Sequence, residues 1–222
     1  MTTTVTFRDG VDSVTFKDGE IKSSGSVTSN GTAATIGIGL DRFSVTRRCI
    51  CQVDISSIPL DAIIVSADLQ LTVSGEGTGD NSIRGALVTE TAWTESSSFP
   101  TWSAMDGSTN WGTAGGTFDG NHIGLGTIPT STGALSLDIK SLARTAHRDK
   151  SGVLNLLLHV NEAGQEDEVT FHSGEATSSG NRPLLTINYV LGLNASKTAR
   201  RGFAGDGKML GPKRKRNLRF RR

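Results

Sequence analysis

The chain has 222 residues, 35% of them hydrophobic, and a formal net charge of only +1 at neutral pH. No apolar run approaches the roughly 18 residues that a transmembrane helix needs, which excludes a protein that crosses a membrane by helices. The length fits one large all-β domain or two small ones, because strand-like runs alternate with turns rich in Gly, Ser and Asn.

The small net charge hides two parts of opposite charge. Residues 197–222 contain 11 Lys or Arg and one acid, which gives +10, whereas residues 1–196 contain 12 Lys or Arg and 21 Asp or Glu, which gives −9. This asymmetry is typical of an acidic globular body with a basic arm that binds another molecule. The start of the chain has neither a basic segment nor an apolar one, so we expect no secretory signal and a protein made in a cytoplasm.

A short duplication opens the chain. The hexapeptide VTFRDG at residues 5–10 recurs as VTFKDG at residues 14–19, and each copy reads as a strand closed by an Asp-Gly turn. We expect residues 1–24 to form a hairpin or an extended β arm. Because an isolated hairpin is marginally stable in water, this arm needs a surface on the body or on a neighbouring subunit, which favours a homo-oligomer.

The central residues, 25–192, read as one β-sandwich body. Alternation of apolar and polar residues is clearest at residues 66–73, the pattern of a half-buried antiparallel strand. The apolar face of that strand carries Ala67, Leu69, Leu71 and Val73. Strands are predicted at residues 35–40, 48–55, 64–73, 83–89, 153–160, 169–171 and 184–190.

One helix and one hairpin are predicted in the second half of the body. Asp138 is a candidate N-cap. The apolar residues that recur after it at helical spacing are Ile139, Leu142, Ala143 and Ala146. The two strands that follow are separated by a short polar tip and are expected to form a hairpin. Such a hairpin would place His159 opposite His172, which we interpret as a cross-strand polar pair rather than a metal site.

The two cysteines, Cys49 and Cys51, lie two positions apart on a predicted strand and therefore point to the same face. We predict that they are small buried hydrophobic side chains in line with Val53 and Ile55. A disulfide between them would be strained. The sequence offers no second Cys or His pair at the spacing of a zinc site.

An ordered set of short motifs runs along the body. They are DISSIP at residues 54–59, IVSADLQL at 64–71, TAWTE at 91–95, TW at 101–102, LDI at 137–139, GVL at 152–154, LLL at 156–158, FHSGE at 171–175 and RPLLTINY at 182–189. In this order they resemble the DNRLRE domain family. The resemblance implies a jelly-roll β-sandwich, found in secreted carbohydrate-associated proteins as a binding or spacer module. Gln52 and Val53 depart from the family's pattern, so the resemblance supports the fold more than a ligand.

The sequence contains no complete catalytic constellation. It has no nucleophile elbow and no phosphate-binding glycine loop. The acids at Glu162 and residues 166–168 crowd one turn, which we interpret as a solvated loop, with a weak cation site as the alternative. Glu175 and Arg182 flank the loop before the last strand and are predicted to form a structural ion pair or a backbone clamp. We therefore predict no enzyme, no cofactor and no metal.

Three tryptophans, Trp93, Trp102 and Trp111, recur every nine residues. Trp93 and Trp102 occupy positions within the ordered motifs and are expected in the core. Trp111 lies in a Gly-rich loop, which makes it the candidate for stacking against a glycan ring.

The basic arm, residues 193–222, carries the candidate anchoring residues. They are Lys208, Leu210, Lys213, Arg214, Lys215, Arg216, Leu218, Arg219, Phe220, Arg221 and Arg222. We favour docking on an acidic groove of a protein partner, with the leucines and the phenylalanine as apolar anchors. Binding to nucleic acid through phosphate contacts and a solvated tail are the alternatives.

These features predict a non-enzymatic structural protein of a bacteriophage or similar virion, assembled in the host cytoplasm. It would be a capsid decoration, a tail-fibre component or another appendage, with its jelly-roll sandwich outside. The arm would hold it to other virion proteins, such as major capsid or tail components. The alternative is a carbohydrate-binding module for a polysaccharide or a cell-surface glycan, which would use Trp111.

Overall fold

Strands dominate the chain, as the alternating pattern predicts. The structure, a computed structural model, describes residues 1–10, 16–24, 31–79, 81–90, 92–95, 100–106, 108–160 and 166–192. Residues 1–192 form one compact unit. The predicted basic arm, with all of its candidate anchoring residues, lies outside the described residues.

Eleven strands and one α-helix lie within the described ranges, with one short 3₁₀ helix, η1 (Ser179–Asn181). The strands are β1 (Thr2–Arg8), β2 (Phe16–Lys22), β3 (Thr35–Leu40), β4 (Thr46–Asp54), β5 (Ala62–Gly75), β6 (Ser82–Leu87), β7 (Ile123–Thr127), β8 (Gly133–Asp138), β9 (Val153–Val160), β10 (Asp167–His172) and β11 (Leu184–Leu191). The sequence did not predict β7 or β8. Glycines at positions 124 and 126 give β7 the composition of a loop, and the strand is held by pairing with β6 and by partial burial of Ile123 and Leu125.

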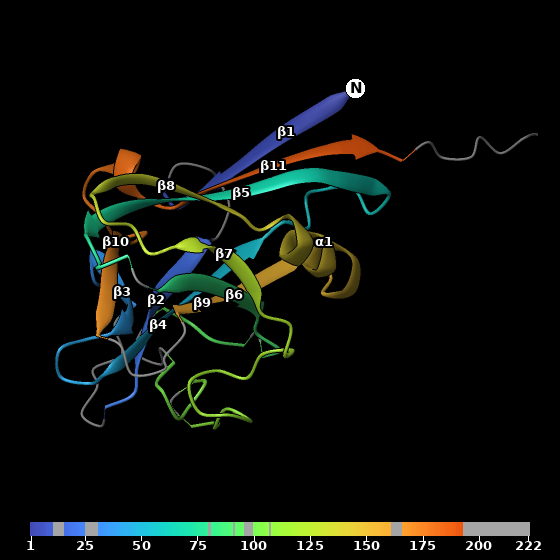
Figure 1. The fold of residues 1–222 in the computed structure, drawn as a ribbon. Coiled ribbons are helices and arrows are strands. Elements are labelled where there is room, and N and C mark those ends of the chain that lie inside the picture. The colour runs from blue at the N-terminus through green and yellow to red at the C-terminus, as the bar shows by residue number, and fades with distance from the viewer. Residues whose placement is uncertain are drawn as a thin grey trace, which may run out of the picture. The chain divides into compact units, whose positions relative to one another are not determined.

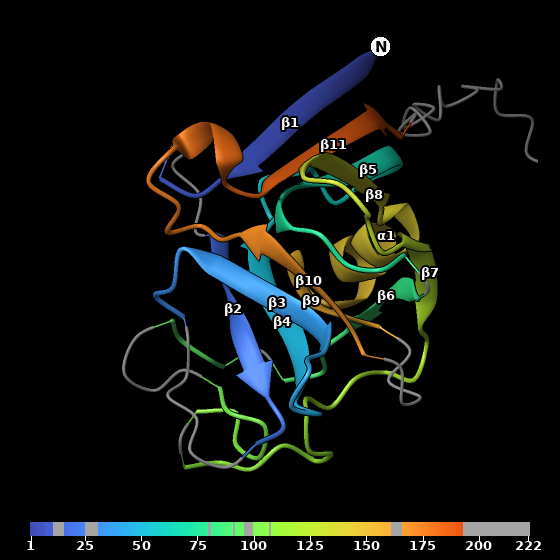
Figure 2. The same cartoon turned by 60° about the vertical axis from the view of Figure 1, so that its left-hand side comes forward.

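The strands form two antiparallel layers that are continuous at one corner (Figure 1 and Figure 2). One layer has the hydrogen-bonded order β1-β11-β5-β10-β3, and β8 also pairs with β5. The second layer has the order β4-β9-β6-β7, and β2 also pairs with β4. The layers join where Gly39 of β3 pairs with Arg47 of β4. This is the predicted all-β, jelly-roll-like sandwich.

The main core fills the space between the layers. Ala67, Leu69, Leu71 and Val73 of β5 are all buried, as their alternation predicts. Cys49 and Cys51 are buried on the same face of β4 and carry free thiols. Both cysteines belong to the main core cluster. The prediction that they are small buried hydrophobic side chains is confirmed.

A second apolar cluster covers the opposite face of the β2-β4-β9 layer. It contains Ile21, Ile50, Val88, Trp93, Trp111 and Leu157. Ile50 lies between the two cysteines in sequence and so points away from the main core. Because both faces of β9 are covered, its sequence VLNLLLHV is almost continuously apolar and buried.

The two N-terminal copies do not form a hairpin with each other, one of the two forms expected for residues 1–24, but both pack on the body, one of the two surfaces expected for them. β1 pairs with β11 in one layer, and β2 pairs with β4 in the other. The physical reason is burial, because Phe7 of the first copy and Phe16 of the second are both buried in the main core. Each copy is therefore a strand of the sandwich.

The predicted hairpin between the strands that carry His159 and His172 is also wrong. β9 pairs with β4 and β6, whereas β10 pairs with β3 and β5. Strands adjacent in sequence thus belong to different layers, as in a Greek-key connection. His159 lies opposite Arg84, and His172 lies opposite Thr35.

The single α-helix, α1 (Lys140–Asp149), lies where the apolar spacing predicts it. Leu142, Ala143 and Ala146 are buried. The N-cap residue is Ile139 rather than Asp138, but the Asp138 carboxylate accepts the backbone N–H of Lys140 at 2.9 Å. Within the described ranges, no helix is long and apolar enough to cross a membrane.

Candidate functional site

Three carboxylates from distant parts of the chain meet beside β2. Asp18 belongs to β2, Glu95 follows the buried Trp93, and Glu175 follows β10. One carboxylate oxygen of each residue lies within 4.8 Å of the other two. We call these three residues the carboxylate cluster. Asp18 is only 1% exposed, and both glutamates are half-buried.

The position of Asp18 follows from the alternation of β2. Phe16, Asp18 and Glu20 occupy every second position, so they share one face of the strand. All three are buried. This strand therefore directs two carboxylates inward, where each needs a polar partner.

Asp18 is only partly satisfied by hydrogen bonds. Its Oδ2 accepts the backbone N–H of Gly174 at 2.9 Å, and its own backbone N–H donates to Oε1 of Glu95 at 2.5 Å. Oδ1 of Asp18 and Oε2 of Glu175 are buried and have no hydrogen-bond partner. Two buried acceptors without donors in one small cluster are unusual in a folded protein.

Burial and mutual repulsion both act on the protonation of the cluster. Burial, with the nearby charge of Glu175, raises the pKa of Asp18 well above its usual range. Burial also raises the pKa of Glu95, to about 7, and raises the pKa of Glu175. The charge of Asp9 adds to the upward shift for all three groups. Negative charge on all three groups at once is therefore electrostatically unfavourable.

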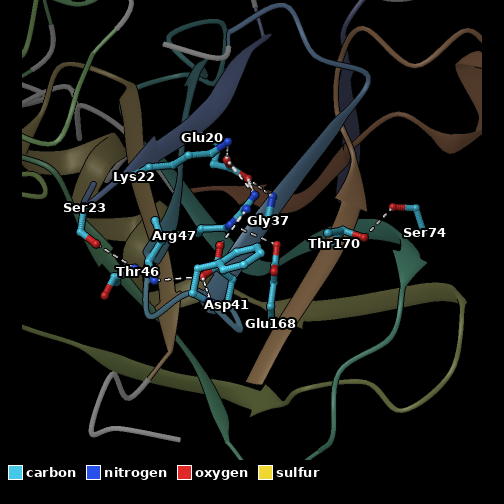
Figure 3. Close-up of polar contacts among 12 residues, drawn as sticks. Glu20, Lys22, Ser23, Gly37, Asp41, Thr46, Arg47, Ser74, Glu168 and Thr170 are labelled. Atoms are coloured by element: carbon cyan, nitrogen blue, oxygen red, sulfur yellow. Dashed lines mark hydrogen bonds and ion pairs between the residues drawn. The ribbon is translucent and has the colours of Figure 1, made fainter. Parts of the chain in front are cut away.

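The inward carboxylate of Glu20, by contrast, has cations beside it. Figure 3 shows Arg47 of β4 at the centre of this second group, with Glu20, Asp41 and Glu168 around its guanidinium at 3.0 to 3.3 Å. Lys22 lies 2.6 Å from Glu20. Asp41, Arg47 and Glu168 of this group line an open groove of about 650 Å³. Because each acid has a basic partner, this network ties β2, β4 and β10 together.

The acids at residues 166–168 do not form the solvated turn that the sequence suggested. Asp167 is buried and accepts the backbone N–H of Thr78 at 2.8 Å, while Glu168 pairs with Arg47. Glu166 is exposed, and Glu162 lies outside the described residues. Strand pairing of β10 with β3 draws two of these acids into the sandwich.

Trp111 does not offer the exposed ring that a glycan platform requires. It is 5% exposed, packs in the second apolar cluster, and donates its indole N–H to the carbonyl of Thr101 at 2.8 Å. The loop around it folds back onto the outer face of β4 and β9, which buries the ring. Trp93 is in the core, as predicted, whereas Trp102 is half-buried under the Arg48 guanidinium at 4.6 Å.

Arg182 is a backbone clamp, one of the two roles predicted for it. Its guanidinium donates to the carbonyls of Ala176 at 2.9 Å and Asp9 at 3.1 Å. Its ion pair is with the Asp9 carboxylate at 3.9 Å. Glu175 instead belongs to the carboxylate cluster, because the chain turns after β10 and brings it beside Asp18.

Sequence reasoning missed two constellations. One is the contact of His159 with His122, whose ring nitrogens lie 2.8 Å apart. The other is the carboxylate cluster itself. Its residues stand out in the sequence, because Asp9 and Asp18 occupy the same position in the two duplicated hexapeptides and each glutamate is the last residue of a short motif. The local sequence around each of these residues does not indicate that they lie close together in the folded chain.

Comparisons with known proteins add no relative that would assign this site. No protein-family model and no curated protein matches the chain.

Proposed function

We propose that this chain is a non-enzymatic structural protein of a virion, a capsid decoration or a tail or appendage component. The sandwich would face outward, and the basic arm would attach it to another virion protein. The observation that carries the proposal is the charge division, with +10 in residues 197–222 and −9 in residues 1–196. A strongly basic segment joined to an acidic body is suited to bind a separate acidic surface.

The composition of the arm supports a protein partner rather than phosphate contacts alone. Leu210, Leu218 and Phe220 are interleaved with the Lys and Arg residues. Apolar anchors between charges are typical of a segment that docks in a groove, where burial supplies affinity and charge supplies steering. A nucleic-acid arm would need only the charges.

A homo-oligomer is part of the proposal, and β1 supplies a surface for it. Among the described strands, β1 pairs only with β11, so its other edge has no strand beside it. Thr2, Thr3 and Thr4 on this strand are exposed. An unpaired edge of this kind can add a strand from a second copy.

Removal of the arm tests the proposal. Residues 1–192 form a compact unit of their own, so a chain that ends at residue 192 should unfold at the same temperature as the full chain. We expect the truncated chain to be absent from purified virus particles that contain the full chain. Normal incorporation of the truncated chain would refute the anchoring role.

Two full-length variants separate the contributions within the arm. Leu210, Leu218 and Phe220 changed together to Ser should reduce incorporation while keeping the charge. A variant with the order of residues 208–222 scrambled keeps composition and charge, and we expect it to fail as well. Normal incorporation of the scrambled arm, together with DNA binding that weakens steeply with salt, would point to nucleic acid instead.

A further inference from the structure

The unsatisfied oxygens of the carboxylate cluster indicate that a positively charged ligand belongs there. Oδ1 of Asp18 and Oε2 of Glu175 are buried without a donor, and Asp18 itself is 1% exposed. A buried ionised carboxylate without full hydrogen bonding is destabilising unless a proton or a cation compensates its charge. One cation could compensate both oxygens, because an oxygen of Asp18 and one of Glu175 lie within 4.8 Å of each other.

Among the described residues, no basic side chain makes a hydrogen bond or ion pair to the cluster, although the charge of Lys17 acts on Glu95 and that of Arg182 acts on Glu175. Lys17 is directed to the side chain of Gln52 and to the carbonyl of Trp93, at 3.3 and 3.4 Å. Arg182 is held by the carbonyls of Ala176 and Asp9, and its ion pair is with the Asp9 carboxylate at 3.9 Å. Glu20, the other inward carboxylate of β2, differs in this respect because it pairs with both Lys22 and Arg47.

The chemistry and spacing of the oxygens fit a calcium ion. Carboxylates are the ligands of hard cations, whereas zinc sites in proteins use mainly His and Cys. Calcium binds oxygens at about 2.3 to 2.6 Å, so ligands on opposite sides of it are about 5 Å apart. The cluster oxygens lie within 4.8 Å of one another. Magnesium binds at roughly 2.0 to 2.1 Å and needs a tighter octahedron.

Asp9 adds a fourth carboxylate to the surroundings. A side-chain carbon placed on Gly174 would lie 3.2 Å from Oδ2 of Asp9, and Gly174 is the residue whose N–H binds Asp18. Asp9 and Asp18 are the fifth residues of the two copies of the duplicated hexapeptide. The two N-terminal strands, which pair in different layers, thus bring the same residue of each copy to one place.

We propose that Asp18, Glu95 and Glu175 bind one calcium ion, with Asp9 as an additional acid beside it. The ion would connect β2 of one layer, the segment after Trp93 and the loop after β10 of the other layer. Its role would be structural, because it neutralises carboxylates that otherwise repel each other across the two layers. The proposal is independent of the function proposed for the arm.

Calcium titration of the full chain tests the site. After treatment with EDTA and dialysis, isothermal titration with CaCl₂ should show one bound ion per chain, and the unfolding temperature should rise with calcium concentration. Magnesium chloride at equal concentration should give a smaller rise. Absence of both binding heat and a thermal shift up to roughly 10 mM CaCl₂ would refute the proposal.

Matched variants locate the ion. Asp18→Asn and Glu175→Gln should each weaken calcium binding by roughly tenfold or more. If the Asp18 variant fails to fold, the Glu175 variant still tests the site, because Glu175 is only half-buried. Glu76→Gln, an exposed acid outside the cluster, should bind calcium as the unchanged chain does. In EDTA, Asp18→Asn should be at least as stable as the unchanged chain, because it removes one of the repelling charges. An equal loss of stability with and without calcium in both cluster variants would show only a hydrogen-bonding role and overturn the proposal.

Discussion

The indole N–H of Trp93 donates to the side-chain oxygen of Asn155 at 2.9 Å, and both residues are 1% exposed. Asn155 lies in the apolar strand β9, and its amide nitrogen donates to the carbonyl of Glu90. One buried amide therefore links the central strand of its layer to the segment that leads toward Glu95. A polar residue in this apolar strand is explained by these two bonds.

Replacement of Asn155 by Leu should destabilise the chain even though the volume is similar. The substitution removes the acceptor of the Trp93 N–H and the donor to Glu90, and the free energy of unfolding should fall by about 2 to 4 kcal/mol. Urea denaturation measures this loss. The control is the double variant that carries both Asn155→Leu and Trp93→Phe. Trp93→Phe should lower the free energy of unfolding by less in this background than in the unchanged chain, because its hydrogen-bond acceptor is already absent. If the losses of unfolding free energy from the two substitutions simply added, the proposed link between Trp93 and Asn155 would be contradicted.

Trp111→Ala should act on stability, because the ring is buried rather than displayed. Loss of a buried aromatic side chain lowers the free energy of unfolding by about 3 to 5 kcal/mol. Trp102→Ala, a half-buried neighbour in the same loop, is the control and should cost less. Thermal and urea unfolding of both variants provide the comparison. A Trp111 variant as stable as the unchanged chain would mean that the ring is exposed after all.

The Asp41 carboxyl should make stability depend on acid pH. Burial alone would raise the pKa of Asp41, but the N–H of Val45, the Arg47 guanidinium and the N–H of Phe43 outweigh it and lower the pKa. In the unfolded chain the group titrates at about 3.9. Because the unfolded state binds more protons between the two values, the stabilisation is fully present above pH 3.9 and is lost as pH falls through the folded-state pKa.

The variant Asp41→Asn tests this dependence. It should be less stable than the unchanged chain at about pH 6, and the difference should shrink when the pH is lowered to about 3. Chemical denaturation at several pH values gives the two curves. A difference that stays constant across this range would show that the charge of Asp41 does not contribute.

The corner between the two layers depends on Gly39. Its φ is +119°, and a side-chain carbon at this position would collide with the backbone carbonyl of Asp167. Gly39→Ala should therefore lower the free energy of unfolding by about 2 kcal/mol or more. Gly124→Ala is the matched control, because nothing lies within 4 Å of the added carbon. We expect the control to change stability by less than about 1 kcal/mol, measured in the same urea series. Equal losses in the two variants would contradict the role of the corner.

Several elements could be predicted from the sequence because their signals are local. The strand β5 shows its buried face in an eight-residue alternation, and Cys49 and Cys51 follow from the same two-residue period. The helix α1 follows from a 3.6-residue period. These periods are set by backbone geometry, so the buried face of a strand or helix can be predicted from its own sequence without knowing which elements pack against it.

The pairing of strands and the carboxylate cluster were decided only by the tertiary structure. The two N-terminal copies are nearly identical in sequence, yet β1 and β2 join different layers, and Phe7 and Phe16 are both buried in the core between those layers. Asp18, Glu95 and Glu175 are far apart along the chain and share no local pattern. What the sequence by itself determined is which faces are apolar and where charge accumulates. Which faces meet depends on long-range pairing, and that is why the candidate site emerged only from the folded chain.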